Sequence, residues 1–321
     1  MTILVTGAGA IGLKTALMLQ ERGERVALAD VRPIDLDGVE AGEGLTTAIC
    51  DVLDRPSLDR LIESHGVTAI VHTAALLSTA IRKDPPRGVL VNTVGTANVL
   101  EAARAFGLRR VVVASSTTVG YSAFASHDAS PIEEDFSLRV VSERPGSVYA
   151  ATKLAAEHLA LLYGDLYGLE VVILRYGAVL SGGAGLATSV PGRLLDLLLT
   201  AGASGRPAVI DEPLLVWAGK EEFIDARDCA VANLHALDAG DPTSRVYNVA
   251  TGEWHSFEDV CAAVRRVHPT LEVDLRVTPK GGFAGFPHLR PAPSDTGAAQ
   301  RELGFRARIG LAETIRDLSR R

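Results

Sequence analysis

The chain opens with Thr2-Ile3-Leu4-Val5-Thr6-Gly7-Ala8-Gly9-Ala10-Ile11-Gly12, an apolar run that leads into a glycine-rich turn and then a helical pattern. A run of this kind predicts a buried strand. Gly7 allows the tight turn, Gly9 lets a ligand approach the backbone, and Gly12 lets the helix pack closely on the strand. We expect the turn to bind dinucleotide phosphates through free N–H groups at the helix start, around Ala10 and Ile11.

An acidic residue supports this interpretation and predicts which dinucleotide is bound. Asp30 ends the second predicted strand, 18 residues beyond Gly12. Its carboxylate can accept hydrogen bonds from both ribose hydroxyls of NAD and would repel the 2′-phosphate of NADP. Arg32 lies close enough to weaken that preference. The sequence also comes near a P-loop, but Leu13 separates Gly12 from the lysine. We therefore expect NAD as the cofactor.

Short apolar runs alternate with helical patterns through the first two thirds of the chain. Strands are predicted at 2–6, 25–29, 46–50, 68–73, 109–115 and 169–175, and helices at about 11–22, 56–64, 86–106 and 148–167. This alternation predicts an α/β fold with a doubly wound parallel sheet of the Rossmann type. The segment 181–192 is predicted to be a loop, and 203–222 and 278–294 are also rich in Gly and Pro. We expect these three segments to help bind the substrate.

Composition narrows the classes of function. The chain has 321 residues and a net charge of −7, which argues against a broad nucleic-acid-binding face. No apolar run reaches the roughly 18 residues that cross a bilayer, and the start does not resemble a signal peptide. Cys50, Cys229 and Cys261 are widely spaced, and the histidines form no H-x-x-x-H pair. We expect no metal, no membrane partner and a cytoplasmic location.

Tyr149 and Lys153 are the strongest catalytic candidates. They form Y-A-A-T-K at the start of a helical pattern, where i,i+4 spacing puts both on one face. A phenol with a pKa near 10 becomes a useful base when an ammonium and an oxidised nicotinamide favour the phenolate. Ser116 ends the fifth predicted strand and is our candidate for orienting the substrate oxygen. Thr117 is the second choice for that role.

Other cofactor contacts are expected where predicted strands end. Asp51 follows the third strand and could accept from an adenine amino group, with Val52 beside the ring; a helix cap is an equal alternative for Asp51. Ala74 and Ala75 follow the fourth strand, where small residues let the backbone approach a ligand. His72, just before them, is expected to be a packed core histidine and not a catalyst.

These motifs together resemble the extended short-chain dehydrogenases/reductases, the NAD-dependent epimerase/dehydratase family. The matching stretches are the glycine motif, Asp30, the H-T-A-A segment, Asn92-Thr93-Val94-Gly95-Thr96 with Asn98-Val99-Leu100-Glu101-Ala102, Ser115-Ser116, Tyr149 with Lys153, Leu174-Arg175-Tyr176, Glu222-Phe223-Ile224-Asp225 and Arg301-Glu302-Leu303-Gly304-Phe305. The resemblance implies an NAD domain, a smaller C-terminal substrate domain and often a dimer formed through helices. It also implies cofactor contacts for Asn92 and Tyr176, a strand at 222–225 and a closing helix at 301–305.

Residues are assigned to the two implied domains as follows. The Rossmann domain comprises 1–176 with parts of 207–250. The substrate domain comprises mainly 177–206 and 251–321. We expect Thr117, Ala178, Arg193 and Arg290 to contact the substrate.

Departures from the family pattern bear on the substrate. The family often spaces its first two glycines by two residues, whereas one residue separates Gly7 from Gly9. Nucleotide-sugar members usually carry Asn where Ala178 stands, and often Arg where Glu221 stands. An unpaired carboxylate about 4 Å from a phosphate would cost roughly 4 kcal/mol at an effective dielectric of 20. Lys220, Arg193 or Arg290 could compensate by turning inward.

The sequence therefore predicts an NAD-dependent oxidoreductase that transfers hydride at a secondary alcohol or ketone. The expected substrate is a sugar, polyol or hydroxy acid. The first alternative is a nucleotide-sugar 4-epimerase of the UDP-hexose type. A non-catalytic NAD-binding regulator is disfavoured by the intact Ser116, Tyr149 and Lys153 set.

Overall fold

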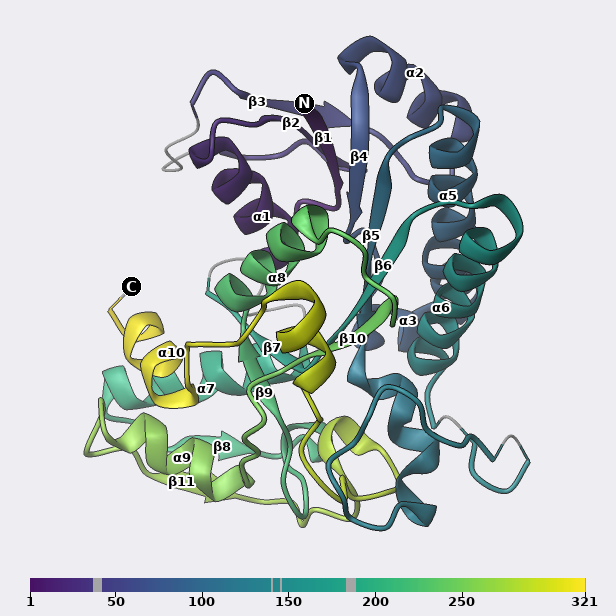
Figure 1. Ribbon diagram of the computed structural model, residues 1–321. Coiled ribbons are helices and arrows are strands. Elements are labelled where there is room, and N and C mark those ends of the chain that lie inside the picture. Colours follow the sequence, from purple (N-terminus) through teal and green to yellow (C-terminus); the bar gives the residue numbers. More distant parts are fainter. Residues whose placement is uncertain (37–41, 140, 145, 183–188, 321) are drawn as a thin grey trace.

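The centre of the molecule is a seven-stranded parallel sheet in the order β10-β6-β5-β4-β1-β2-β3 (Figure 1). The computed structural model describes residues 1–36, 42–139, 141–144, 146–182 and 189–320. The sheet strands are β1 (Thr2–Thr6), β2 (Arg25–Asp30), β3 (Leu45–Ile49), β4 (Val67–His72), β5 (Arg110–Ser116), β6 (Val171–Tyr176) and β10 (Val246–Val249). The chain steps outward from β1 to β3 and then crosses to β4, so the predicted doubly wound fold is confirmed.

Helices cover both faces of this sheet. The helices α1 (Ala10–Glu21) and α8 (Ala226–Asp238) lie on one face, and α2 (Arg55–His65), α5 (Gly95–Ala105) and α6 (Val148–Tyr167) lie on the other (Figure 1). Alternate residues of β1 serve the two faces: Ile3 and Val5 pack in one apolar cluster, and Leu4 packs in the other. Burial on both faces explains why the central strands read as unbroken apolar runs.

The helix predicted at 86–106 consists of three consecutive pieces. These are α4 (Pro85–Val89), the π-helical turn η1 (Leu90–Val94) and α5, and the short helix α3 (Ser78–Lys83) precedes them. The π turn widens the helix beside Asn92 without ending it. No helix in the part of the chain that the structure describes is long and apolar enough to cross a membrane.

A second group of elements packs below the sheet in Figure 1 around its own apolar cluster. It contains α7 (Val190–Ser204), α9 (Phe257–Arg265), α10 (Leu311–Leu318) and two strand pairs, β7 (Ala178–Leu180) with β9 (Phe223–Asp225) and β8 (Ala208–Ile210) with β11 (Val273–Leu275). Trp217 lies in the cluster with its ring centroid 5.7 Å from that of Phe223 and 5.1 Å from that of Phe283. Among the described residues, the remaining helical turns are η2 (Thr117–Ser126), η4 (Pro213–Leu215), η5 (Phe283–Gly285) and η6 (Ala299–Leu303).

The sequence predictions in this half are partly right. The strand expected at 222–225 is β9, and the closing helix expected at 301–305 is the π-helical η6, which ends at Leu303. The loop predicted at 181–192 is wrong at its end, because Ser189 caps α7 by accepting from the Gly192 N–H at 3.1 Å. Residues 183–188 of that prediction lie outside the described residues. The segment 203–222 contains the end of α7 and the strand β8.

The turn between β1 and α1 depends on backbone approaches that only glycine permits. Gly7 has φ +89°, and a Cβ there would lie 2.6 Å from the Ala74 backbone nitrogen. A Cβ on Gly12 would lie 1.9 Å from the Gly7 carbonyl oxygen. A Cβ on Gly9 would meet no described atom within 4 Å. Gly7 and Gly12 therefore serve packing, whereas Gly9 faces open space.

Gly12→Ala is expected to destabilise the fold by roughly 1–3 kcal/mol, because the added methyl overlaps a backbone oxygen that cannot rotate away. Thermal unfolding followed by circular dichroism measures the effect. Gly9→Ala is the matched control and should melt close to the parent chain. Equal melting temperatures for Gly12→Ala and the parent would contradict the close approach of α1 to the turn.

Candidate active site

The glycine turn lies at the carboxyl end of β1, next to β4, where the strand order reverses. In the described residues, no side chain caps the N-terminus of α1, so its first N–H groups are available to an anion. Asp30 lies beside them and accepts from the Ala8 N–H at 2.9 Å and from the Arg32 N–H at 3.1 Å. The open space at Gly9, the uncapped helix and the adjacent carboxylate fit a dinucleotide with free ribose hydroxyls.

The other predicted cofactor residues surround the same edge of the sheet. Asp51 accepts from Arg87 Nη2 at 3.2 Å and from the Leu53 N–H at 3.0 Å, so its carboxylate already has two partners. Val52 is buried, and its backbone oxygen accepts from Asn98. Ala74 and Ala75 follow β4, and Ala74 lies against the glycine turn.

Asn92 joins three segments at this edge. Its amide exchanges hydrogen bonds with the backbone of Leu76 at 2.7 and 3.0 Å and donates to Thr152 Oγ1 at 3.1 Å. These bonds hold the segment after β4 against α6. The geometry therefore gives Asn92 a scaffold role, and the contact with the cofactor stays a prediction.

Ser116, Tyr149 and Lys153 converge between β5 and the start of α6. Ser147 caps α6 by accepting from the Ala150 N–H at 3.0 Å, which places Tyr149 and Lys153 in the first two turns. Lys153 is buried, its Nζ donates to the Ala114 carbonyl at 2.8 Å, and it lies 6.0 Å from the centre of the Tyr149 ring. Ser116 ends β5, and its hydroxyl acts on the Tyr149 phenol by lowering the pKa of that phenol. The three predicted catalytic side chains thus share one site.

Burial governs the acid–base character of this site. Desolvation raises the pKa of Tyr149 to about 12, and the hydrogen bond from Ser116 acts in the opposite direction. Desolvation also lowers the pKa of Lys153 to about 8, against the charge of Glu157, which raises it. In the free protein near pH 7, Tyr149 is a phenol and Lys153 is an ammonium. This is the state needed to donate a proton to a carbonyl oxygen.

His72 behaves as the packed core histidine that the sequence suggested. Its Nδ1 lies 2.7 Å from Thr6 Oγ1 and its Nε2 lies 3.0 Å from Thr96 Oγ1. Desolvation, together with the nearby Lys153 charge, lowers the pKa of His72 to about 3. It stays neutral at physiological pH and adds no charge to the catalytic site.

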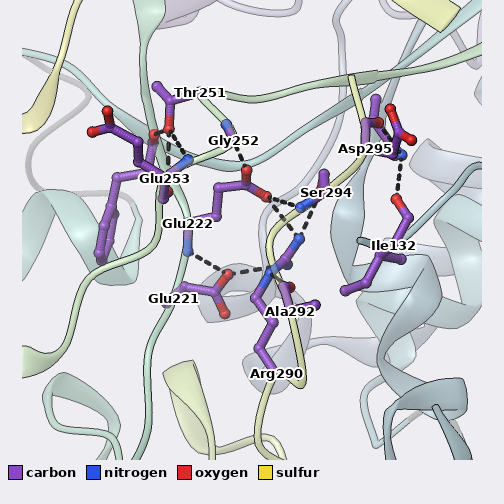
Figure 2. A network of polar contacts seen from close by, with 12 residues as sticks. Ile132, Glu221, Glu222, Thr251, Gly252, Glu253, Arg290, Ala292, Ser294 and Asp295 are labelled. Carbon is purple, nitrogen blue, oxygen red and sulfur yellow. Dashed lines mark hydrogen bonds and ion pairs between the residues drawn. The ribbon is translucent and has the colours of Figure 1, made fainter. Parts of the chain in front are cut away.

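Glu221 and Arg290 belong to one buried network (Figure 2). Arg290 donates to Glu221 Oε1 at 3.2 Å and to Glu222 Oε2 at 2.7 Å, and its Nη2 also donates to Ser294 Oγ at 2.7 Å. Tyr121 donates to the second oxygen of Glu221. Glu221 is therefore paired, and the repulsion expected from an unpaired carboxylate at this position is absent. The Arg290 guanidinium therefore already has hydrogen-bond partners inside the protein, and its predicted contact with the substrate stays a prediction.

The remaining predicted residues have the following places. Arg193 on α7 pairs with Glu212, and Ala178 in β7 donates its backbone N–H to the Glu222 carbonyl at 2.9 Å. Thr117 is buried directly after Ser116. The Tyr176 hydroxyl donates to Asn233 at 2.7 Å, toward α8 and away from Tyr149. The substrate and cofactor contacts assigned to these four residues stay predictions.

Sequence reasoning missed the charged residues that support the catalytic helix. Glu157 lies buried on α6 and pairs with Arg175 of β6. The signal was present, because Glu157 follows Lys153 by four residues and Arg175 precedes Tyr176 in a stretch already singled out. Tyr121 was also missed, because its link to Glu221 joins residues 100 positions apart in the sequence.

Comparisons with known proteins find relatives along nearly the whole chain. UDP-glucose 4-epimerase of Bacillus subtilis (strain 168) is 29% identical over 350 residues, which covers 99% of the chain and 95% of the epimerase. An L-threonine dehydrogenase from Cupriavidus necator has a TM-score of 0.80 at 26% identity and covers 100% of this chain and 99% of that chain. A UDP-glucose 4-epimerase from Stenotrophomonas maltophila, solved with bound NAD and formylated UDP-arabinopyranose, has a TM-score of 0.80 at 26% identity, with 100% and 97% covered. The model of the NAD dependent epimerase/dehydratase family matches residues 3–250, and the chain belongs to that family.

Proposed function

We propose that the protein is an NAD-dependent oxidoreductase that interconverts a secondary alcohol and a ketone on a sugar, polyol or hydroxy acid. The observation that carries this proposal is the convergence of Ser116, Tyr149 and Lys153 beside the dinucleotide-binding edge of the sheet. When bound, NAD would supply the nicotinamide ring that exchanges hydride with the substrate carbon. Asp30 and the first turn of α1 would hold its ribose and phosphates.

The protein's own residues handle the proton. Ser116 orients the substrate oxygen through its hydroxyl, and Tyr149 Oη donates a proton to that oxygen during reduction or removes one during oxidation. Lowering the pKa of Tyr149 from about 12 to 7 takes roughly 7 kcal/mol of favourable electrostatics. The Lys153 ammonium supplies part of this, and the positive charge of oxidised nicotinamide adds to it.

The substrate proposed here is small and lacks a nucleotide. A diphosphate needs several convergent donors. Ala178 has no side-chain donor, Arg290 is engaged by Glu221 and Glu222, and Arg193 is paired with Glu212.

We propose a division of the chain into two domains. Residues 177–206 and 251–321, which supply most of the apolar cluster around Trp217, form the substrate domain. The Rossmann domain comprises 1–176 with parts of 207–250.

A nucleotide-sugar 4-epimerase is the second candidate. The nearly full-length similarity to the Bacillus subtilis epimerase favours it. Both reactions use the same acid–base residues, and they differ in whether reduced cofactor accumulates.

We propose a homodimer formed through the outer surface of α4, η1, the C-terminal end of α5, and α6. The exposed apolar side chains of this surface are Val89, Leu90, Val94, Phe106, Leu162, Leu166 and Tyr167. Leu162 and Leu166 lie one turn apart, as do Leu90 and Val94, so each pair shares a helix face. An apolar face of this kind is typical of a subunit interface.

We also propose a cytoplasmic location. Cys50, Cys229 and Cys261 are buried free thiols in the structure. Unpaired cysteines suit a reducing compartment.

Tyr149→Phe is expected to lower kcat by about 100-fold or more, because the proton carrier is lost while the ring still packs. NAD binding, followed by fluorescence quenching, and the melting temperature should stay close to those of the parent. Tyr167→Phe, on the exposed end of the same helix, is the matched control and should keep full activity. A near-normal kcat for Tyr149→Phe would remove Tyr149 from the mechanism.

NAD should be preferred to NADP. A carboxylate about 5 Å from the 2′-phosphate costs about 3 kcal/mol at an effective dielectric of 20, on the order of 100-fold. The ratio of kcat/KM for the two cofactors measures the preference, and Asp30→Asn should narrow it. A parent enzyme that favours NADP would show that Arg32 outweighs Asp30.

Net oxidation of a small substrate should distinguish the two candidate reactions. With NAD and a panel of sugars, polyols and hydroxy acids, we expect NADH to accumulate for at least one compound. With UDP- or dTDP-hexoses, we expect neither NADH nor a new stereoisomer after chromatographic separation. Stereoisomer formation without net NADH would replace this function with the epimerase.

A further inference from the structure

A buried carboxylate lies behind the catalytic lysine. Glu157 is one turn beyond Lys153 on α6, and its exposed fraction is 1%. Its Oε1 accepts from Arg175 Nε at 2.9 Å and from the Ser115 hydroxyl, and its Oε2 accepts from Arg175 Nη2 at 2.7 Å. Four-residue spacing directs Glu157 and Lys153 to the same helix face.

The surroundings of Glu157 are fixed by the sheet. Ser115 and Arg175 are paired residues of the adjacent strands β5 and β6, so both side chains reach the same face beneath α6. Arg175 also donates to the Glu134 carbonyl at 2.6 Å and lies 4.9 Å from the centre of the Phe136 ring. The guanidinium thus fixes the orientation of the carboxylate and joins it to the segment that follows the catalytic strand.

Few other charges act on Lys153 within the described residues. Tyr149 and Glu157 come from its own helix, and neutral His72 comes from β4. From β5, the Ala114 carbonyl and the Ser115 hydroxyl are uncharged, and Arg175 of β6 is paired with both oxygens of Glu157. Glu157 is therefore the nearby negative charge that can support the ammonium against its burial.

We propose that Glu157 is a positioning residue of the catalytic site, whose carboxylate, held by Arg175 and Ser115, keeps the Lys153 ammonium charged beside Tyr149. This inference rests on the proposed function, which assigns Lys153 to the tuning of Tyr149. A purely structural ion pair would account for the contact with Arg175, because buried pairs are costly to break. It would not account for a change in the titration of Lys153.

The test measures the titration of Lys153 directly. The chain contains five lysines, so selective 13Cε-lysine labelling gives five NMR signals, and Lys153→Arg identifies the one from Lys153. The parent signal should titrate near the pKa of about 8 that burial imposes on Lys153. Glu157→Gln should lower that midpoint by about one pH unit or more, because the nearby opposite charge is gone. In turnover assays of carbonyl reduction, activity should then fall at a correspondingly lower pH as the pH is raised.

Ser115→Ala is the matched control. It removes one hydrogen bond to Glu157, but the two bonds from Arg175 still hold the charged carboxylate in place, so the Lys153 midpoint should stay near the parent value. If Glu157→Gln does not fold, the double variant Glu157→Gln/Arg175→Met removes both buried charges without orphaning the guanidinium, and its midpoint should still fall.

Two results would overturn the inference. One is a folded Glu157→Gln or double variant in which Lys153 titrates at the parent midpoint. The other is an equal shift in Ser115→Ala, which would assign the effect to packing. The NMR titration needs neither cofactor nor substrate. A failure of this inference can therefore be distinguished from a failure of the proposed reaction.

Discussion

The buried ammonium of Lys153 is the group on which the active-site geometry depends. A charge out of contact with water must be hydrogen-bonded and paired. Here its Nζ donates to the carbonyl of Ala114 in the central strand β5, and the Glu157 carboxylate lies one helical turn away. The hydrogen bond from Lys153 to Ala114 holds α6 against β5. This packing brings Tyr149 on the helix close to Ser116 at the end of the strand.

The edge of the sheet where the dinucleotide is expected to bind depends on a different constraint. There, backbone segments approach one another closely. The contacts at Gly7 and Gly12 draw α1 against β1 and the segment after β4, so the helix N-terminus faces the crevice where the strand order reverses. Asp30 reaches the same place from β2 by accepting the Ala8 N–H. Asn92 holds the opposite side of this edge to α6 through Leu76 and Thr152. The dinucleotide edge and the catalytic helix are therefore parts of one hydrogen-bonded frame.

A third arrangement is the buried network of Glu221, Glu222 and Arg290. Two carboxylates share one guanidinium, and the Ser294 N–H donates to Glu222 (Figure 2). The Tyr121 hydroxyl donates to Glu221. Burial raises the pKa of Glu222, against the Arg290 charge that lowers it. The Arg290 guanidinium is thus paired with carboxylates inside the protein. The family scaffold is thus kept while a potential anion-binding group is used for structure.

Local patterns in the sequence were enough to predict the sheet, the glycine turn with Asp30, and the i,i+4 pair of Tyr149 and Lys153. Strands buried on both faces and helix periodicity depend on neighbours along the chain, so they can be read without a structure. The ion pair between Glu221 and Arg290, which are 69 residues apart, could not be predicted from local patterns. Nor could the pairing of Glu157 with Arg175, which depends on the register of β5 against β6 and on how α6 lies across them. Charges separated in sequence meet only after folding, and the tertiary structure alone decides whether each faces a ligand or another side chain.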